Sequence, residues 1–125
     1  MDYNSTGKFT VNGPSHPVVA IVGKDVLLEC LLKPEISVIS NMVVRWFKSG
    51  IGSAVHVYRN GEDDTSAQDH GYRGRTELFK DELTKGNISL RIKNTKVHDE
   101  GKYICSVDGE TDFEETTVEL KVGGQ

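Results

Sequence analysis

The sequence predicts an all-β domain built as an antiparallel sandwich or barrel. Short runs in which apolar and polar residues alternate recur along the whole chain, and turn residues bound each run. This period of two is typical of half-buried strands. Apolar residues at helical spacing are hard to find in the same sequence. About nine short strands and no convincing helix are typical of an antiparallel sandwich or barrel.

The expected strands can be placed in chain order from this alternation. They cover residues 18–23, 25–32, 42–47, 54–61, 75–80, 87–93, 102–107 and 116–122. The fourth run closes on Asn60-Gly61, which is a signal for a tight hairpin turn. Residues 60–74 are polar and rich in turn formers, so we expect a loop or a weak edge strand there.

Cys30 and Cys105 are the only cysteines among the 125 residues. A bridge between them would close a loop of about 75 residues and contribute roughly 4 kcal/mol by constraining the unfolded chain. The alternative is a pair of buried free thiols in a cytosolic protein. Trp46 lies between the two cysteines, and the order Cys, Trp, Cys is the pattern of the immunoglobulin sandwich. In that fold the disulfide joins the two sheets and the indole packs against it.

The stretch DEGKYIC, residues 99–105, carries a second part of this pattern. Tyr103 is two residues before the second cysteine, the position of the tyrosine corner, whose hydroxyl bonds to nearby backbone. Gly101 would allow a tight backbone turn into the strand. In the immunoglobulin V-type pattern, an aspartate at the position of Asp99 pairs with an arginine at the start of the fourth strand, and Arg75 stands there. Together these residues predict an immunoglobulin V-type antiparallel β-sandwich.

Four longer motifs are GPSHPVVAIVGKDVLLEC, VHVYRNGED, YRGRTELFKDEL and SLRIKNTKVHDEGKYIC. They closely resemble the V-type domains of the butyrophilin and myelin oligodendrocyte glycoprotein family, and the similarity runs from Phe9 to Val122. VHVYRNG together with YRGRTEL is a much narrower signature than the cysteines and the tryptophan. One departure is Thr95, which stands where the family usually has an aliphatic residue, so its hydroxyl needs a partner in the core.

Members of the family that this chain resembles are type I cell-surface glycoproteins, related to T-cell costimulatory ligands, and act through protein–protein contacts. The resemblance therefore implies an extracellular recognition domain at the plasma membrane, with a protein partner and a role in immune (T-cell) regulation. The alternative is a homophilic adhesion domain that pairs with copies of itself. The stretch FEETTVELKV lacks the aromatic-Gly-x-Gly bulge usual in antigen-receptor variable domains, which disfavours a rearranging receptor.

We expect one domain over residues 9–122, with flexible ends at 1–8 and 123–125. Asn4 and Asn87 each begin an N-x-[ST] sequon, so both are candidates for N-linked glycosylation. No window approaches 18 consecutive apolar residues, so a membrane span would have to lie outside this chain. The net charge of −4 argues against a general nucleic-acid binder, which needs a basic face.

Alternation also divides the central strands between the two faces of their sheet. With the tryptophan and Tyr103 pointing inward, the residues expected to point outward are Arg45, Phe47, Ile104 and Ser106. Phe47 and Ile104 would form an apolar patch with Arg45 at its polar rim, and such patches often mark an interface. Tyr58 on the neighbouring strand is a further candidate, unless a bulge changes its direction. The alternative is that the chain ends or neighbouring loops cover the patch.

The stretch DGETDFEE, residues 108–115, is expected to form the loop between the last two strands. It carries five acidic residues, one aromatic residue and no base. We expect an acidic contact surface for a basic partner, with Phe113 as anchor and Asp108 and Asp112 among the acidic groups. The alternative is an ordinary solvated hairpin that its charge keeps soluble.

No arrangement of residues for catalysis or metal binding is visible. The histidines His16, His56, His70 and His98 are scattered and lack metal-ligand spacing. The paired acidic residues lack the glycine and ligand spacing of a calcium loop. The sequence also has no Gly-x-Ser-x-Gly elbow and no phosphate-binding loop. We therefore expect no enzyme activity, no cofactor, no metal and no small-molecule substrate.

Overall fold

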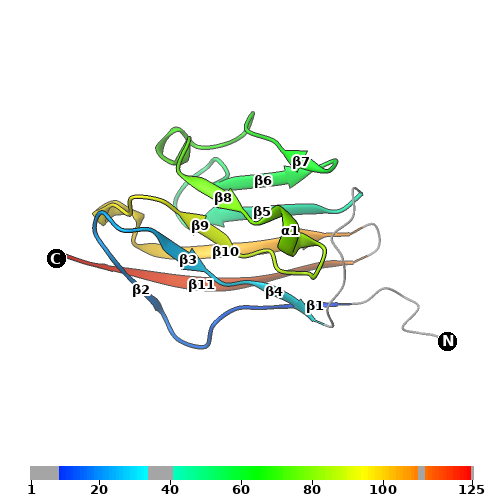
Figure 1. Cartoon of the computed structure of the whole chain (residues 1–125), viewed down its shortest axis with the longest axis horizontal. Coiled ribbons are helices and arrows are strands. Elements are labelled where there is room, and N and C mark those ends of the chain that lie inside the picture. Colours follow the sequence, from blue (N-terminus) through cyan, green and yellow to red (C-terminus); the bar gives the residue numbers. More distant parts are fainter. Residues whose placement is uncertain (1–8, 34–40, 110–111, 125) are drawn as a thin grey trace.

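Two layers of β-strands pack against each other in the structure, which is a computed structural model (Figure 1). The structure describes residues 9–33, 41–109 and 112–124. The described strands form one six-stranded, one three-stranded and one two-stranded sheet. The predicted V-type sandwich with one disulfide between its sheets is therefore confirmed.

The larger layer, called the front sheet below, has the strand order β2-β11-β10-β5-β6-β7. The bounds are β2 (Val18–Ile21), β5 (Val43–Lys48), β6 (His56–Arg59), β7 (Glu62–Asp63), β10 (Gly101–Asp108) and β11 (Phe113–Gly123). Neighbouring strands are antiparallel except for β2, which runs parallel to β11. The long strand β10 therefore has a partner on each side and is held firmly at the centre of the sheet.

The back layer combines the sheet β3-β9-β8 with the pair β1-β4. The bounds are β1 (Thr10–Asn12), β3 (Val26–Leu28), β4 (Leu31–Lys33), β8 (Thr76–Leu78) and β9 (Leu90–Ile92). A bridge between Leu31 and Asn87 continues the pairing from one sheet to the other. The helical elements are η1 (His70–Tyr72), α1 (Lys80–Leu83) and η2 (Val97–Asp99). Among the described residues, no helix has the length and apolar character that crossing a membrane requires.

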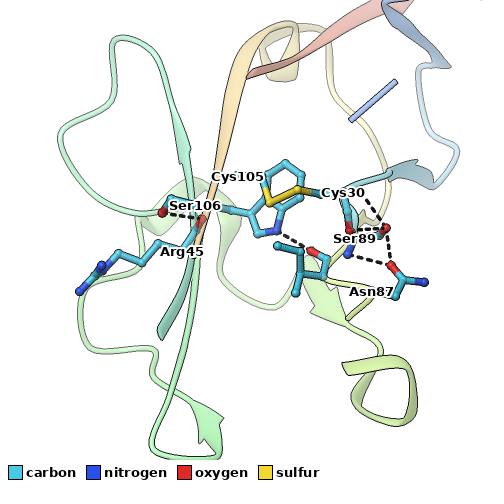
Figure 2. The surroundings of a disulfide bond; sticks show 8 residues. Cys30, Arg45, Asn87, Ser89, Cys105 and Ser106 are labelled. Carbon is cyan, nitrogen blue, oxygen red and sulfur yellow. Dashed lines mark hydrogen bonds between the residues drawn. A yellow bond between two sulfur atoms is a disulfide. The ribbon is translucent and has the colours of Figure 1, made fainter. Parts of the chain in front are cut away.

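The Cys30–Cys105 disulfide joins the two layers inside the core (Figure 2). Trp46 of β5 is the cross-strand partner of Cys105, and its side chain is fully buried. The indole Nε1–H donates to the carbonyl of Ile88 in the back layer at 3.0 Å. The tryptophan thus fills the space beside the disulfide and keeps its one polar group paired.

Tyr103 forms the expected tyrosine corner. Its hydroxyl donates to the backbone carbonyl of Asp99 and accepts a hydrogen bond from the Tyr72 hydroxyl at 2.7 Å. The two rings meet edge to face, with their centroids 6.4 Å apart. Burial raises the pKa of Tyr72 to about 12. Burial, followed by the bond to Tyr72, also raises the pKa of Tyr103, so both hydroxyls keep the protons that they donate.

Arg75 and Asp99 form the ion pair expected from the V-type pattern. Nη1 of the arginine donates to Oδ2 of the aspartate and Nη2 to Oδ1, each at 2.9 Å. The Lys96 backbone N–H also donates to Oδ2, at 2.8 Å. Burial alone would raise the pKa of Asp99, but the hydrogen bonds from Arg75 and Lys96 outweigh burial and hold this pKa below its ordinary value of 3.8. The pair links Arg75, directly before β8, to Asp99 at the end of η2.

Several local features can be compared with the sequence-based expectations. The β6–β7 hairpin turns at Asn60 and Gly61 as predicted, and both have the positive φ that such a turn needs. The polar stretch 60–74 contains the edge strand β7 and the helical turn η1. Sequence periodicity does not reveal α1, η2 and β1, because three or four residues are too few to establish a period. β11 continues through Gly123, one residue past the expected domain end, and residues 1–8 lie outside the described residues.

Thr95 does not have the side-chain partner that its position in the core calls for. It is 1% exposed, and its hydroxyl has no hydrogen-bond partner among the described residues. Its backbone is fully paired, because its N–H donates to the Lys24 carbonyl and its carbonyl accepts from the Gly23 N–H, both at 2.8 Å. The departure from an aliphatic residue therefore costs stability through one unpaired side-chain group.

Replacing Thr95 with valine should stabilise the domain. Valine has nearly the same shape and removes the unpaired hydroxyl, so we expect the free energy of unfolding to rise by about 1 kcal/mol. Urea unfolding followed by tryptophan fluorescence would measure the change. Thr117→Val, at an exposed position in β11, is the matched control and should change stability by less than about 0.5 kcal/mol. A Thr95→Val variant no more stable than the parent would contradict the assignment of an unpaired hydroxyl.

The Arg75–Asp99 pair should give the domain a distinct response to acid. Because the folded state lowers the pKa of Asp99, the carboxylate stabilises the fold above pH 3.8 and loses this effect as the pH falls through the lowered pKa. Asp99→Asn should lower the free energy of unfolding by about 3 kcal/mol at pH 7, since Arg75 loses its charged partner. The difference in stability between the parent and this variant should become smaller below pH 3.8.

Denaturant unfolding of the parent and the Asp99→Asn variant between pH 7 and pH 2 would test this response. Asp81→Asn, at an exposed position of α1, provides a control for loss of a carboxylate and should differ little from the parent at every pH. A stability difference for Asp99→Asn that stays constant with pH would rule out the ionised pair as its cause.

Candidate functional site

The candidate site is the outer surface of the front sheet, called the front face below. The core side of this sheet carries the tryptophan and the disulfide, so alternate residues on its strands point away from the core. The strand register pairs Arg45 with Ser106 and Phe47 with Ile104. The front face comprises Val43, Arg45, Phe47, Val57, Lys102, Ile104, Ser106, Asp108, Phe113, Glu115, Thr117 and Glu119.

Phe47 and Ile104 lie directly opposite each other on β5 and β10. Directly opposed residues have Cβ atoms about 5 Å apart, so the two side chains form one apolar centre on this face. Both are half-buried rather than fully exposed, because they cover part of each other's surface and part of the sheet. Thr117 of β11 continues the same row on the other side of Ile104 and is exposed.

A polar row lies next to this apolar centre. Arg45 Nη1 is 3.8 Å from Asp108 Oδ2, and these side chains are 27% and 47% exposed. An ion pair with this exposure contributes at most about 1 kcal/mol to the free energy of unfolding, so the two charges remain available to a partner. Ser106 is only 1% exposed and its hydroxyl donates to the Arg45 carbonyl at 3.4 Å. Figure 2 shows Arg45 and Ser106 on the opposite side of the strands from the disulfide.

The β10–β11 hairpin differs in shape from the expected acidic loop. Asp108 and Phe113 form the last cross-strand pair, so both belong to strands. The Gly109 N–H donates to the Asp112 carbonyl at 2.8 Å and closes the hairpin. Residues 110 and 111 lie outside the described residues. Phe113 is 53% exposed, as its expected role requires, while Asp108 has a basic neighbour in Arg45 that the local sequence does not reveal.

Tyr58 does not lie on the front face, so its assignment to the patch is corrected. It is the cross-strand partner of Val44, whose side chain is completely buried, and it packs against the core. On this side of the sheet Lys80 Nζ is 5.9 Å from the centre of its ring. The residue of β6 that does share the front face is Val57, the partner of Arg45, and it is 3% exposed.

A shallow groove of about 290 Å³ borders the front face. It is lined by Pro14, Ser15, His16, Pro17, Lys102, Thr117 and Glu119. The last three of these residues belong to the front face, so the groove extends the candidate site toward the N-terminal strand. These three residues and Val57 are not among those that the sequence predicts for this face. Alternation shows which residues share a face within one strand, but only the register shows which residues of different strands are neighbours.

A polar network supports the β7 edge of the front sheet; His56 and Gln68 in it are buried, whereas Asp63 and Lys80 are exposed. Gln68 Nε2 donates to Thr76 Oγ1 at 2.9 Å, and this hydroxyl lies 2.8 Å from His56 Nδ1. His56 Nε2 and Lys80 Nζ contact the two carboxylate oxygens of Asp63, each at 2.9 Å. Burial opposes ionisation of Asp63, but the bonds from Lys80 and His56 prevail and lower its pKa. The network joins β6, β7, β8 and α1.

The described residues contain no group of three or more His, Cys, Asp and Glu side chains placed to hold a metal ion. The polar groups of the network above bond to one another, so a role in structural support accounts for them. The features that remain open to a ligand are the apolar centre, the Arg45–Asp108 pair and Phe113. Such a surface is suited to contact with another macromolecule.

The six-stranded front sheet, the disulfide with its tryptophan, and the Arg75–Asp99 pair define the class of immunoglobulin V-type domains. The family model "Immunoglobulin V-set domain" matches residues 13–123. The chain therefore belongs to the immunoglobulin V-set family, and its resemblance to butyrophilin and myelin oligodendrocyte glycoprotein is confirmed.

The chain is similar in sequence or structure to three proteins of this kind. Human myelin-oligodendrocyte glycoprotein is 42% identical over 116 residues, which are 93% of this chain and 47% of that protein. The crystal structure of bovine butyrophilin has a TM-score of 0.86 at 36% identity, covering 94% of this chain and 55% of the other. The human B7-H4 IgV-like domain has a TM-score of 0.84 at 34% identity, with 94% and 98% covered.

These relatives are cell-surface recognition proteins with V-type domains and are not enzymes. The chain spans about half the length of the myelin-oligodendrocyte glycoprotein that it matches. The comparisons thus identify the kind of module to which the chain belongs.

The Arg45–Asp108 pair should contribute little to folding. Asp108→Asn removes the charge but keeps the shape, and an exposed pair 3.8 Å apart should change the free energy of unfolding by less than about 1 kcal/mol. Chemical denaturation at low and at high salt would measure this, and the small difference should vanish in high salt because exposed charges are screened. A loss of several kcal/mol would mean that the pair belongs to the structural framework and is not free for recognition.

Proposed function

We propose that this chain is the extracellular recognition domain of a butyrophilin-like cell-surface glycoprotein. In this proposal it binds a protein partner through the front face and the adjoining hairpin, and the contact serves immune regulation involving T cells. The observation that carries the proposal is the direct pairing of Phe47 and Ile104 on the outer surface of the central strands. The cell-surface relatives support the extracellular location.

The composition of the front face supports a protein as the partner. Interfaces typically combine an apolar centre that includes aromatic residues with a polar rim. Here Phe47 and Ile104 form the centre, Arg45 lies in the next row opposite Ser106, and Asp108 lies in the row beyond, within 3.8 Å of Arg45. Phe113, the first residue of β11, adds a second aromatic side chain and is 53% exposed, which suits a contact anchored at two points.

The charge of the face indicates what kind of partner would fit. Glu115 and Glu119 of β11 lie on the front face with Asp108, whereas its basic residues are Arg45 and Lys102. Arg45 is paired with Asp108, and Lys121 of β11 lies 3.9 Å from Glu119, so the face carries charges of both signs. A partner with complementary charges would approach faster and align better, and its binding would weaken as the salt concentration rises.

Substitution of Phe47 should separate recognition from folding. Phe47→Arg places a charge at the apolar centre, so we expect multimers of the variant to bind T cells or other leukocytes about tenfold or more weakly than parent multimers. Leu27→Arg is the matched control, because Leu27 is 47% exposed on a strand of the back layer. Flow cytometry over a concentration series, on multimers checked for folding, would compare the three proteins. Equal loss for both variants would contradict a role for the front face.

The same variants distinguish a separate partner from homophilic adhesion, the second candidate function. Sedimentation of the parent domain over a wide concentration range should show a monomer if the front face is reserved for another protein. A parent dimer that Phe47→Arg abolishes and Leu27→Arg preserves would instead assign the front face to self-association.

A further inference from the structure

Exposed apolar side chains lie at the end of the sandwich that holds the C-terminus. Figure 1 shows the C-terminus, the β2–β3 turn and the connection that contains η2 at one end of the long axis, and the β6–β7 and β10–β11 hairpins at the other. The first is called the C-terminal end below and comprises residues 21–25, 48–49, 94–102 and 119–124; the second is called the hairpin end. Val22 in the turn is 41% exposed, and Val97, the first residue of η2, is 69% exposed. Apolar side chains exposed to this degree at one end point to a contact outside the domain.

Backbone hydrogen bonds hold the segments of the C-terminal end together. The Val22 N–H donates to the Gly123 carbonyl at 3.0 Å, so the β2–β3 turn lies beside the end of β11. The Gly23 N–H donates to the Thr95 carbonyl, and the Thr95 N–H donates to the Lys24 carbonyl, both at 2.8 Å. The turn is therefore fixed to the connection that carries Val97, and the two valines are held in place by paired backbone.

The C-terminal end is basic, although the whole chain has a net charge of −4. Its lysines are Lys24, Lys48, Lys96, Lys102 and Lys121.

The carboxylates of the C-terminal end offset only part of this charge. Asp25 and Asp99 each accept hydrogen bonds from an arginine at 2.9 Å, Asp25 from Arg91 and Asp99 from Arg75. Glu100 and Glu119 are the remaining acidic residues of this end. Five lysines therefore stand against two glutamates, and Lys24 and Lys96 are exposed on the same two connections as the valines.

The hairpin end has the opposite charge. The acidic residues of its two hairpins include Glu62, Asp108, Asp112 and Glu114. The domain thus has a basic end with exposed valines and an acidic end along one axis, and such an axis favours one orientation beside a charged surface.

We propose that the C-terminal end docks on a lipid bilayer with anionic headgroups. Val22 and Val97 enter the headgroup layer, and Lys24 and Lys96 bind the anionic groups beside them. Apolar side chains next to exposed lysines are typical of protein surfaces that lie at a membrane interface, and the attraction of lysines to anionic lipid acts over short distances. The charge of this end complements such a bilayer, whereas the hairpin end is repelled by it.

Docking at this end orients the front face. The strands of the front sheet run between the hairpin end and the C-terminal end (Figure 1), so the sheet stands upright on the bilayer. Phe47 and Ile104 then face sideways, and the hairpin that carries Phe113 points away from the lipid. The inference rests on the proposed cell-surface location, because a contact this small forms only when the domain is held close to a membrane.

The test holds the chain on vesicles and measures how deeply its C-terminal end lies in the lipid. A histidine tag after Gln125 binds the chain to vesicles that contain a nickel-chelating lipid, in phosphatidylcholine with or without about 20% phosphatidylserine. An environment-sensitive fluorophore is attached to Val97→Cys or, at the hairpin end, to Phe113→Cys. We expect a blue shift of the emission at position 97 on the phosphatidylserine vesicles and no shift at position 113. The shift should be lost in about 1 M salt, where charges are screened within about 3 Å.

A pair of charge-matched variants shows whether the effect belongs to this end. Lys24→Glu with Lys96→Glu should abolish the blue shift at position 97. Lys33→Glu with Lys85→Glu changes the net charge equally, at exposed positions outside the C-terminal end, and should preserve the shift. Equal loss in both double variants would overturn the proposal.

Two further outcomes would also overturn the proposal. Emission at position 97 that is the same on both kinds of vesicle would exclude docking on anionic lipid. A shift that appears on pure phosphatidylcholine and grows with the density of the bound chain would instead assign the end to a second copy. Each result leaves the proposed role of the front face untouched, because the binding of leukocytes is tested separately with Phe47→Arg.

Discussion

The cross-strand pair of Trp46 with Cys105 is the constraint on which the rest of the structure depends. The cysteine is bonded to Cys30 of the back layer, and the tryptophan donates a hydrogen bond to the Ile88 carbonyl in that layer. These two contacts determine the inward side of β5 and β10. Since a strand alternates strictly, a shift of either strand by one residue would expose the indole and bury Arg45, so the register has no alternative of similar free energy.

The front face is a direct product of that register. Once Trp46 and Cys105 point inward, their neighbours Phe47 and Ile104 must point outward and oppose each other. Recognition and stability are thus separated on alternate residues of the same strands. The inward set can remain constant while the outward set changes, which is how one sandwich can carry many different binding surfaces.

Much of this arrangement can be predicted from the sequence, because a period of two and the Cys, Trp, Cys order report directly on burial. The disulfide, the tyrosine corner and the Arg75–Asp99 pair depend on residue types at fixed offsets. The direction of Tyr58 does not follow from the sequence, because its own strand gives no information on which neighbour it opposes. The lack of a partner for the Thr95 hydroxyl among the described residues, and the position of Asp108 beside Arg45, depend on distances between segments far apart in the chain.

The two-residue strand β7 ends the front sheet on one side and limits what can be added there. Glu62 and Asp63 are exposed and acidic, and Asp63 is bound by both His56 and Lys80. Short, charged edge strands are poor templates for an incoming strand. A neighbouring polypeptide therefore finds little backbone to pair with on this side. The domain can be displayed at high local density with little risk that its sheets will join into aggregates through this edge.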